Sequence, residues 1–185
     1  MLIHTNVMKM DNDYRFSYFS SLTKQTVYAR TWQGLLLLSA DGERALFPDT
    51  RAKDIIWWLD IRDATKEEVQ MLSQVLDIHP LTTEDVISRE THEKVEAFRD
   101  YYLVSFQTLV HGDESPAGVY ILVFRHGVVT FSPSGCGHVR RVRDRIRRMH
   151  DPSVLSGDWI SYALMYASPW DFFFISLVAD RLSQR

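Results

Sequence analysis

Residues 31–90 alternate between short apolar runs and stretches in which apolar residues recur every three or four positions. The run Leu35–Leu38 predicts a buried strand, and Arg44–Phe47, which follows an Asp-Gly turn, predicts a short partner strand. Ile55–Ile61 is a third apolar run with strand character. Residues 1–30 contain aromatic side chains without a clear period, so we expect a weakly structured N-terminal segment.

Two helices are expected next. Thr65 and Glu68 have the T-x-x-E spacing of a capping box, in which each side chain satisfies a backbone amide at the start of a helix. The apolar residues after it recur at helical spacing: Val69, Leu72, Val75 and Leu76. Pro80 suits the first turn of a second helix, because a proline there sacrifices no hydrogen bond. We therefore expect helices near 65–77 and 80–90.

The second half of the chain predicts three strands and two more helices. The strands are Tyr101–Val110, Gly118–Phe124 and Val128–Phe131, and the last two have the spacing of a tight hairpin. An amphipathic helix follows, with one face formed by Val139, Val142, Ile146 and Met149. A final helix is expected to begin near Asp158, whose side chain can cap it.

This order of elements predicts an α/β fold with a mixed β-sheet sandwiched between helices. The chain divides into a weakly structured segment (1–30), an α/β domain (31–157) and a C-terminal helix (158–185). We find no internal repeat that would suggest a solenoid.

Composition narrows the classes of function. Of the 185 residues, 45% are hydrophobic and 24% are charged, as in ordinary globular proteins, and the net charge of −3 argues against an electrostatic nucleic-acid binder. A single cysteine, Cys136, excludes an internal disulfide framework, and the N-terminus lacks the pattern of a signal peptide.

Trp159–Ala179 is long and apolar, but Pro169 and Asp171 interrupt it, so we favour a buried or interfacial helix over a membrane span.

Two clusters suggest chemistry other than metal binding. Six arginines share one predicted helix, which suits either phosphate binding or a solvated face with acidic neighbours: Arg140, Arg141, Arg143, Arg145, Arg147 and Arg148. No aromatic residue interleaves with them for base stacking, so we favour the solvated face. Cys136 and His138 suggest a thiolate nucleophile with a base, but no third, orienting residue is evident. We therefore expect that the protein is not an enzyme.

Glu84 and Asp85 are the candidate ligands for a divalent cation. Mg²⁺ prefers carboxylate oxygens and retains water, so two adjacent acids can offer a weak, hydrated site, especially across a subunit interface. The alternative is that both carboxylates only balance the amide dipoles of the first helical turn. The seven histidines lack zinc-site spacing, and His79, directly before Pro80, is interpreted as shaping a helix entrance.

Residues 57–165 carry a series of motifs in a consistent order. WLDIRDATKEEVQMLSQVLDIHPLTTEDV, which begins at Trp58, resembles the strand, helix and HPL-x-x-ED segment in the N-terminal cytosolic domain of CorA-type magnesium transporters. KVEAFRDYYLVSFQTL, GVYILVFRHGVVTF, VRDRIRRM and WISYALM resemble the segments that follow in that family. RFSYFSS and the Trp57–Trp58 pair resemble its fungal Alr and Mnr branch.

The resemblance implies a domain at the cytosolic face of the plasma membrane or the vacuolar membrane. In the family, five such domains form a funnel below a pore, and Mg²⁺ held between neighbouring domains keeps the channel closed. Glu84 and Asp85 occupy the matching positions. The resemblance therefore implies a magnesium-sensing, regulatory domain of a homopentameric transporter, with Mg²⁺ as its ligand.

The chain also departs from the family pattern. The pore tripeptide Gly-Met-Asn is absent, so we expect no pore in this chain and attachment to the membrane only through helices that it lacks. The stalk carboxylate that completes the family's site has no counterpart, so we expect weak Mg²⁺ binding. The stalk and membrane helices that supply most of the family's pentamer interface are absent as well, so we expect a monomer or weak dimer. Similarity decays after Met165. A stand-alone soluble regulator that associates with a full-length transporter is the alternative function, and the residues do not distinguish Mg²⁺ from other divalent cations.

Overall fold

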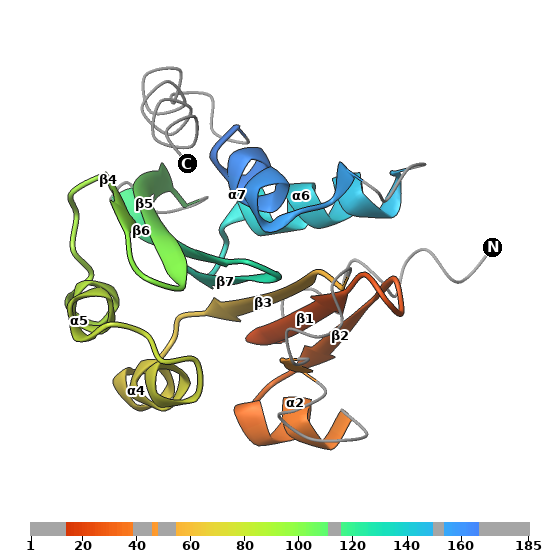
Figure 1. Cartoon of the computed structure of the whole chain (residues 1–185), viewed down its shortest axis with the longest axis horizontal. Coiled ribbons are helices and arrows are strands. Elements are labelled where there is room, and N and C mark those ends of the chain that lie inside the picture. Colours follow the sequence, from red (N-terminus) through yellow and green to blue (C-terminus); the bar gives the residue numbers. More distant parts are fainter. Residues whose placement is uncertain (1–13, 39–45, 48–54, 111–115, 150–153, 167–185) are drawn as a thin grey trace.

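The computed structural model describes residues 14–38, 46–47, 55–110, 116–149 and 154–166. These residues form one seven-stranded sheet with helices on both faces, a three-layer α/β/α arrangement that Figure 1 shows edge-on. The expected fold class, a mixed β-sheet sandwiched between helices, is confirmed.

The structure gives each element its bounds. The strands are β1 (Phe16–Ser20), β2 (Gln25–Ala29), β3 (Trp57–Arg62), β4 (Lys94–Ala97), β5 (Tyr101–Leu109), β6 (Pro116–Phe124) and β7 (Gly127–Ser132). The described helices are α2 (Trp32–Leu38), α4 (Lys66–Val75), α5 (Pro80–Ser88), α6 (Gly137–Arg147) and α7 (Gly157–Tyr166).

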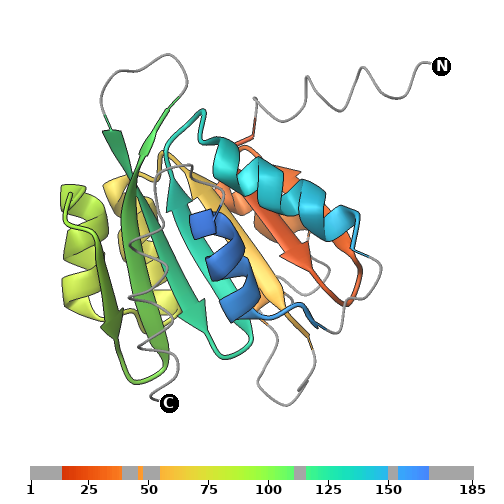
Figure 2. The same ribbon diagram turned by 90° about the horizontal axis from the view of Figure 1, so that it is seen from above.

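The strands lie in the order β2-β1-β3-β7-β6-β5-β4. β3 and β7 run parallel, whereas the other neighbouring strands pair antiparallel, so the sheet is mixed. The predicted hairpin is present, because Phe124 pairs with Gly127 across a two-residue turn. Helices α6 and α7 cover one face (Figure 2), and α2, α4 and α5 lie on the other (Figure 1).

Alternation along the strands supplies a hydrophobic core on each face. Successive side chains of a strand point to opposite faces, so Trp58 and Ile121 pack with α6 and α7, whereas Leu59 and Leu122 pack with α2, α4 and α5. All four side chains are fully buried. Burial on both faces explains why the central strands read as continuous apolar runs in the sequence.

Helix α4 begins as its sequence predicts. The Thr65 hydroxyl accepts a hydrogen bond from the Glu68 amide at 3.3 Å, and the Glu68 carboxylate accepts one from the Thr65 amide at 2.9 Å. Arg15 joins this cap to β1 through an ion pair with Glu68 at 2.6 Å. Val69 and Leu72 point into the core. The capping box and the helix predicted near 65–77 are therefore confirmed.

The strand predicted at Leu35–Leu38 is wrong, because these residues lie in helix α2. The Thr31 hydroxyl accepts a hydrogen bond from the Gly34 amide and begins the helix. Leu35 is buried, but Leu37 is 86% exposed, as one-sided packing of a helix requires. Of the proposed partner strand Arg44–Phe47, Leu46 is helical and residues 44 and 45 lie outside the described residues.

The expectation of weak structure in residues 1–30 is wrong for residues 16–29, which form the β1–β2 hairpin. β1 lies between β2 and β3 and is buried on both faces. Ser17 and Ser20 are also buried there, so polar residues break the apolar run that a central strand normally shows. Residues 1–13 lie outside the described residues. The sheet therefore continues across the boundary predicted at residue 30, while the boundary at 157 stays a prediction.

Helix α7 begins at Gly157, one residue before the predicted start. Its cap is Ser156, whose hydroxyl accepts a hydrogen bond from the Trp159 amide at 3.1 Å, while Asp158 accepts one from the Tyr102 hydroxyl. No helix in the described ranges combines the length and the apolar character needed to cross a membrane. The remainder of the apolar segment, residues 167–179, lies outside the described residues.

Candidate metal site

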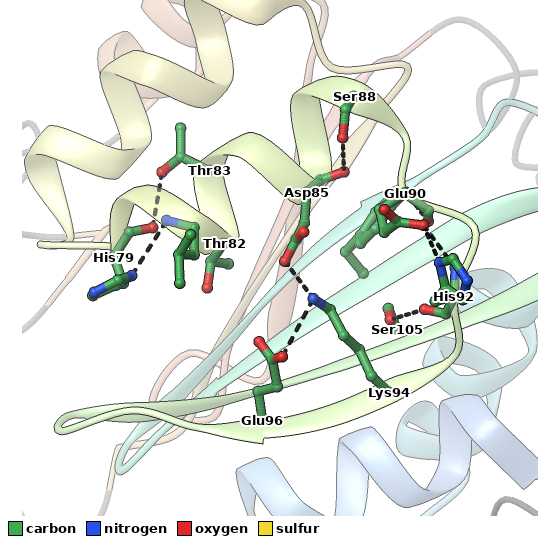
Figure 3. A network of polar contacts seen from close by, with 12 residues as sticks. His79, Thr82, Thr83, Asp85, Ser88, Glu90, His92, Lys94, Glu96 and Ser105 are labelled. Carbon is green, nitrogen blue, oxygen red and sulfur yellow. Dashed lines mark hydrogen bonds and ion pairs between the residues drawn. The ribbon is translucent and has the colours of Figure 1, made fainter.

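Helix α5 carries the predicted metal ligands and is fixed at its first turn. The His79 ring accepts a hydrogen bond through Nδ1 from the Leu81 amide at 3.2 Å, and Pro80 is the first helical residue. The Tyr101 hydroxyl accepts a hydrogen bond from the His79 amide and donates one to Thr82 at 2.8 Å, which ties α5 to β5. The interpretation of His79 as shaping the helix entrance is confirmed, and Figure 3 shows it beside Thr82 and Thr83.

Glu84 and Asp85 are the fifth and sixth residues of α5, beyond its first turn. The alternative that they only balance the first-turn dipoles is wrong, because that interaction falls off within the first turn, which here contains no acid. Glu84 is exposed, whereas the Asp85 side chain is only 16% exposed. Consecutive residues of a helix point about 100° apart, so the helix by itself does not aim both carboxylates at one point.

Asp85 is held by a lysine from the edge strand of the sheet. Lys94 Nζ lies 2.8 Å from Asp85 Oδ2 and 3.4 Å from Glu96 Oε1 (Figure 3). Desolvation lowers the pKa of Lys94, but the hydrogen bond and negative charge of Asp85, with those of Glu96, outweigh it and leave the pKa raised. A cation that approaches Asp85 Oδ2 would therefore compete with the Lys94 ammonium group.

A second polar cluster, centred on Glu90, lies beyond the end of α5. Glu90 Oε1 accepts hydrogen bonds from the Thr91 amide, from the His92 amide and from His92 Nδ1 at 2.6 Å, and these bonds, led by the His92 side chain, lower the pKa of Glu90. The Tyr120 hydroxyl donates to the Glu90 carbonyl. Burial, then the charges of Asp85 and Glu90, raises the pKa of Tyr120 to about 12, so the phenol stays neutral.

These contacts limit what the site can bind. In the part of the chain that the structure describes, no group of three or more histidine, cysteine or acidic side chains is arranged to hold a metal ion. Glu84 offers an open carboxylate, and Asp85 offers one that already neutralises Lys94. Metal binding here needs oxygen ligands from elsewhere, so the assignment of Glu84 and Asp85 as ligands stays a prediction.

Sequence reasoning missed Lys94 and Glu96 as neighbours of the candidate ligands. Both residues point from β4 towards α5, while Val95 between them packs against the opposite face of the sheet. The alternation of charged and apolar residues in Lys94-Val95-Glu96 could have indicated them, because it is typical of a half-buried strand at the edge of a sheet.

The structure does not arrange Cys136 and His138 as a nucleophile and its base. Burial raises the pKa of the Cys136 thiol, which disfavours the thiolate. Both His138 ring nitrogens are engaged elsewhere, with Nε2 at 2.9 Å from the Thr108 hydroxyl and Nδ1 at 3.0 Å from the Leu164 carbonyl. His138 therefore joins α6 to β5 and α7.

The arginine cluster on α6 divides into two kinds of residue. Five arginines are exposed, as the solvated face predicts: Arg140, Arg141, Arg145, Arg147 and Arg148. Arg143 is only 4% exposed and lies over the ring of Trp58 at 5.0 Å from its centroid. The interpretation as a solvated face is thus confirmed for the exposed five and wrong for Arg143.

Known proteins resemble this chain in sequence. The family model described as CorA-like Mg²⁺ transporter protein matches residues 53–168. The putative metal ion transporter C27B12.12c of Schizosaccharomyces pombe is 41% identical over 160 residues, which cover 84% of this chain and 20% of that protein. The magnesium transporter ALR1 of Saccharomyces cerevisiae is 38% identical over 156 residues, which cover 82% of this chain and 18% of that protein. The chain spans about a fifth of the length of these relatives.

Solved structures resemble it in fold. The soluble domain of CorA from Methanocaldococcus jannaschii aligns with a TM-score of 0.56 at 15% identity, over 82% of this chain and 54% of that one. The full-length CmaX protein aligns with a TM-score of 0.61 at 12% identity, over 92% of this chain and 49% of that one. The family match covers more than half of the chain and contains α5 with Glu84 and Asp85, and with the curated relatives it establishes that the chain belongs to the CorA-like Mg²⁺ transporter family.

Proposed function

We propose that this chain is the magnesium-sensing, regulatory domain of a CorA-type divalent metal ion transporter, at the cytosolic face of the plasma membrane or the vacuolar membrane. The observation that carries the proposal is the family match over residues 53–168. A fold like that of the CorA soluble domain supports it. The full-length protein would assemble as a homopentamer, and its pore would lie in helices outside this chain.

In this proposal Glu84 and Asp85 are the ligands of a regulatory Mg²⁺. Mg²⁺ dehydrates reluctantly, so it would keep most of its water and bind the two carboxylates of α5 weakly. It would also compete with Lys94, which lies 2.8 Å from Asp85. Oxygen ligands from a neighbouring subunit would complete the shell. We expect millimolar binding by the isolated chain, about 4 kcal/mol at the 1 M standard state.

Titration of the chain with Mg²⁺ tests this site. The double variant E84A/D85A is expected to lose the millimolar binding and keep its fold, because neither side chain belongs to the hydrophobic core. Isothermal titration calorimetry measures the binding.

A matched control separates the site from general loss of negative charge. E67A/D144A also removes one exposed helical glutamate and one ion-paired helical aspartate, because Asp144 pairs with Arg147 at 3.3 Å, and it should bind Mg²⁺ like the wild type. Equal Mg²⁺ affinity in E84A/D85A and the wild type would move the site elsewhere.

Assembly provides a second test. Specific interfaces generally bury on the order of 1,000 Å² or more, and most of the pentamer contacts in the proposal belong to helices outside this chain. We therefore expect a monomer or weak dimer at micromolar concentration, measured by sedimentation. A stable pentamer in the absence of metal would contradict this expectation.

The alternative is a stand-alone soluble regulator that associates with a full-length transporter. It shares the family match, so the downstream transcript separates the two proposals. Two apolar spans after a Gly-Met-Asn sequence would establish the transporter, and their absence would favour the regulator.

A further inference from the structure

A cavity lies on the face of the sheet opposite to α5. It has a volume of about 430 Å³, which is within the range of small-molecule sites, roughly 300–1,000 Å³. The β1–β2 hairpin forms one wall and the C-terminal half of α6 the other, and Leu155, just before α7, contributes to it. The candidate metal site does not share any of its lining residues.

The rim of this cavity is cationic. Lys24 and Arg147 are exposed there, the buried Arg143 lies in the wall, and none of the lining residues is acidic. Lys24 lies in the turn between β1 and β2, where its backbone φ is 55°, so a turn and a helix bring cations to one opening. The charged side chains that line the cavity are all cations, and Asp144 and Asp60 lie behind two of them, at 3.3 Å from Arg147 and 3.8 Å from Arg143.

One of the two exposed cations is held in place before any ligand arrives. Arg147 donates to the Tyr28 hydroxyl at 2.8 Å and pairs with Asp144 at 3.3 Å. Arg143, in contrast, is 4% exposed, donates to the Ser17 hydroxyl and faces the Asp60 carboxylate at 3.8 Å, so it belongs to the wall of the cavity and not to its rim. The preorganised guanidinium group of Arg147 loses little freedom when it binds an anion, and its fork geometry suits phosphate oxygens.

The remainder of the cavity is partly apolar and partly neutral polar, with Ser21 among its polar residues. Its apolar lining residues come from β1, from α6 and its end, and from the segment before α7: Phe19, Ile146, Met149 and Leu155. Thr26 and Gln25 add neutral polar groups. A phenyl ring and a flexible thioether suit a flat aromatic ligand group, because both make favourable contacts with rings.

We propose that this cavity binds a soluble organic phosphate of nucleotide size, with its phosphates at Lys24 and Arg147 and its ring system against Phe19, Ile146 and Met149. This site is additional to the proposed function and does not depend on it, because the two sites lie on opposite faces of the sheet. A bare phosphate would use only the rim, so affinity should depend on both halves of the ligand.

Calorimetry with magnesium-free ATP and with inorganic triphosphate as probes tests the site. The wild type is expected to bind ATP at least tenfold more tightly than triphosphate, because burial of a ring adds about 1.5–3 kcal/mol. The variant K24A/R147A should lose about tenfold or more in ATP affinity, the loss of charge-assisted contacts. M149A should weaken binding of ATP several-fold and leave that of triphosphate unchanged.

The control R140A/R148A removes two exposed cations of the same helix that do not line the cavity, and it should bind ATP like the wild type. An equal loss in this control, or equal affinity of the wild type for ATP and triphosphate, would reduce the site to a diffuse basic surface and overturn the proposal. Absence of ATP binding at millimolar concentration would also overturn it.

A second experiment tests binding to vesicles that contain phosphorylated inositol lipids. Binding to these vesicles without ATP binding would assign the cations to a lipid headgroup instead.

Discussion

Replacing Asp60 with alanine is expected to lower the free energy of unfolding by about 3–5 kcal/mol, the usual cost of breaking a buried ion pair. Asp60 is fully buried in β3, and its Oδ2 lies 3.8 Å from Arg143 of α6, which is 4% exposed. The variant would leave a buried guanidinium without the negative charge that faces it. Chemical denaturation with urea measures the loss.

The Asp60 carboxylate also organises hydroxyl groups on the neighbouring strand. Its Oδ1 accepts hydrogen bonds from Thr130 at 2.6 Å and from Ser132 at 3.0 Å. Thr130 in turn accepts one from the Trp58 indole at 3.2 Å. One carboxylate thus links β3, β7 and α6, so its removal should also loosen the packing of α6 on the sheet.

Two further variants distinguish the buried pair from an ordinary surface contact. D60A/R143M removes both charges of this pair and leaves Arg62, which lies 3.9 Å from Asp60 Oδ2. It should recover much of the stability lost in D60A, because apolar replacement of a buried pair is often nearly neutral. D144A breaks the exposed pair with Arg147 and should cost no more than about 1 kcal/mol. A cost below 1 kcal/mol for D60A would mean that water or rearrangement already compensates the guanidinium.

The sequence predicted the elements whose pattern is local. The capping box at Thr65 and Glu68 depends on residues three apart, and the β6–β7 hairpin depends on a two-residue turn. The apolar run of β3 likewise marked a strand, but not the partner of its one acid. Asp60 and Arg143 are far apart in sequence, and only the packing of α6 across β3 and β7 brings them together.

The failures have a common cause, which is tertiary context. Leu35–Leu38 reads as a strand because four consecutive apolar residues lack a period, yet the Thr31 cap and one-sided burial make it helical. β1 was missed because Ser17 and Ser20 are buried between two neighbouring strands. Hydrogen bonds to neighbouring strands can hold a segment in a sheet even when its own side chains show no strand pattern.

The candidate metal site was predictable only in part. The sequence placed Glu84 and Asp85 on a helix, and counting from Pro80 would already have put them beyond the first turn. The Lys94 ion pair depends on the position of β4 at the edge of the sheet, where it pairs with β5 and lies beside α5. No local pattern around residue 85 contains that information.

The close approach of β3 and β7 at Gly127 gives the second large effect on stability that we expect. Gly127 begins β7 and pairs with Trp57 across the parallel β3–β7 ladder. A Cβ atom added at Gly127 would lie 2.0 Å from Cε2 of Trp57. That ring is confined by Phe47 and Phe124, whose centroids lie 5.0 and 5.9 Å away. The backbone of Trp57 is also fixed, because its amide donates to the His126 carbonyl at 3.1 Å.

We therefore expect G127A to lower the free energy of unfolding by about 3 kcal/mol, the upper end for overpacking, because neither the indole nor the strand can move aside. Thermal and urea unfolding measure the loss.

G34A is the matched control, since its added Cβ meets only the Thr31 hydroxyl at 3.2 Å and the Ala29 side chain, and it should change stability by less than about 1 kcal/mol. Combining G127A with W57L removes the clashing ring, so the effects of the two changes should be non-additive by about 1–3 kcal/mol in the stabilising direction. Strict additivity would show that the cost of G127A comes from the backbone rather than from the indole of Trp57.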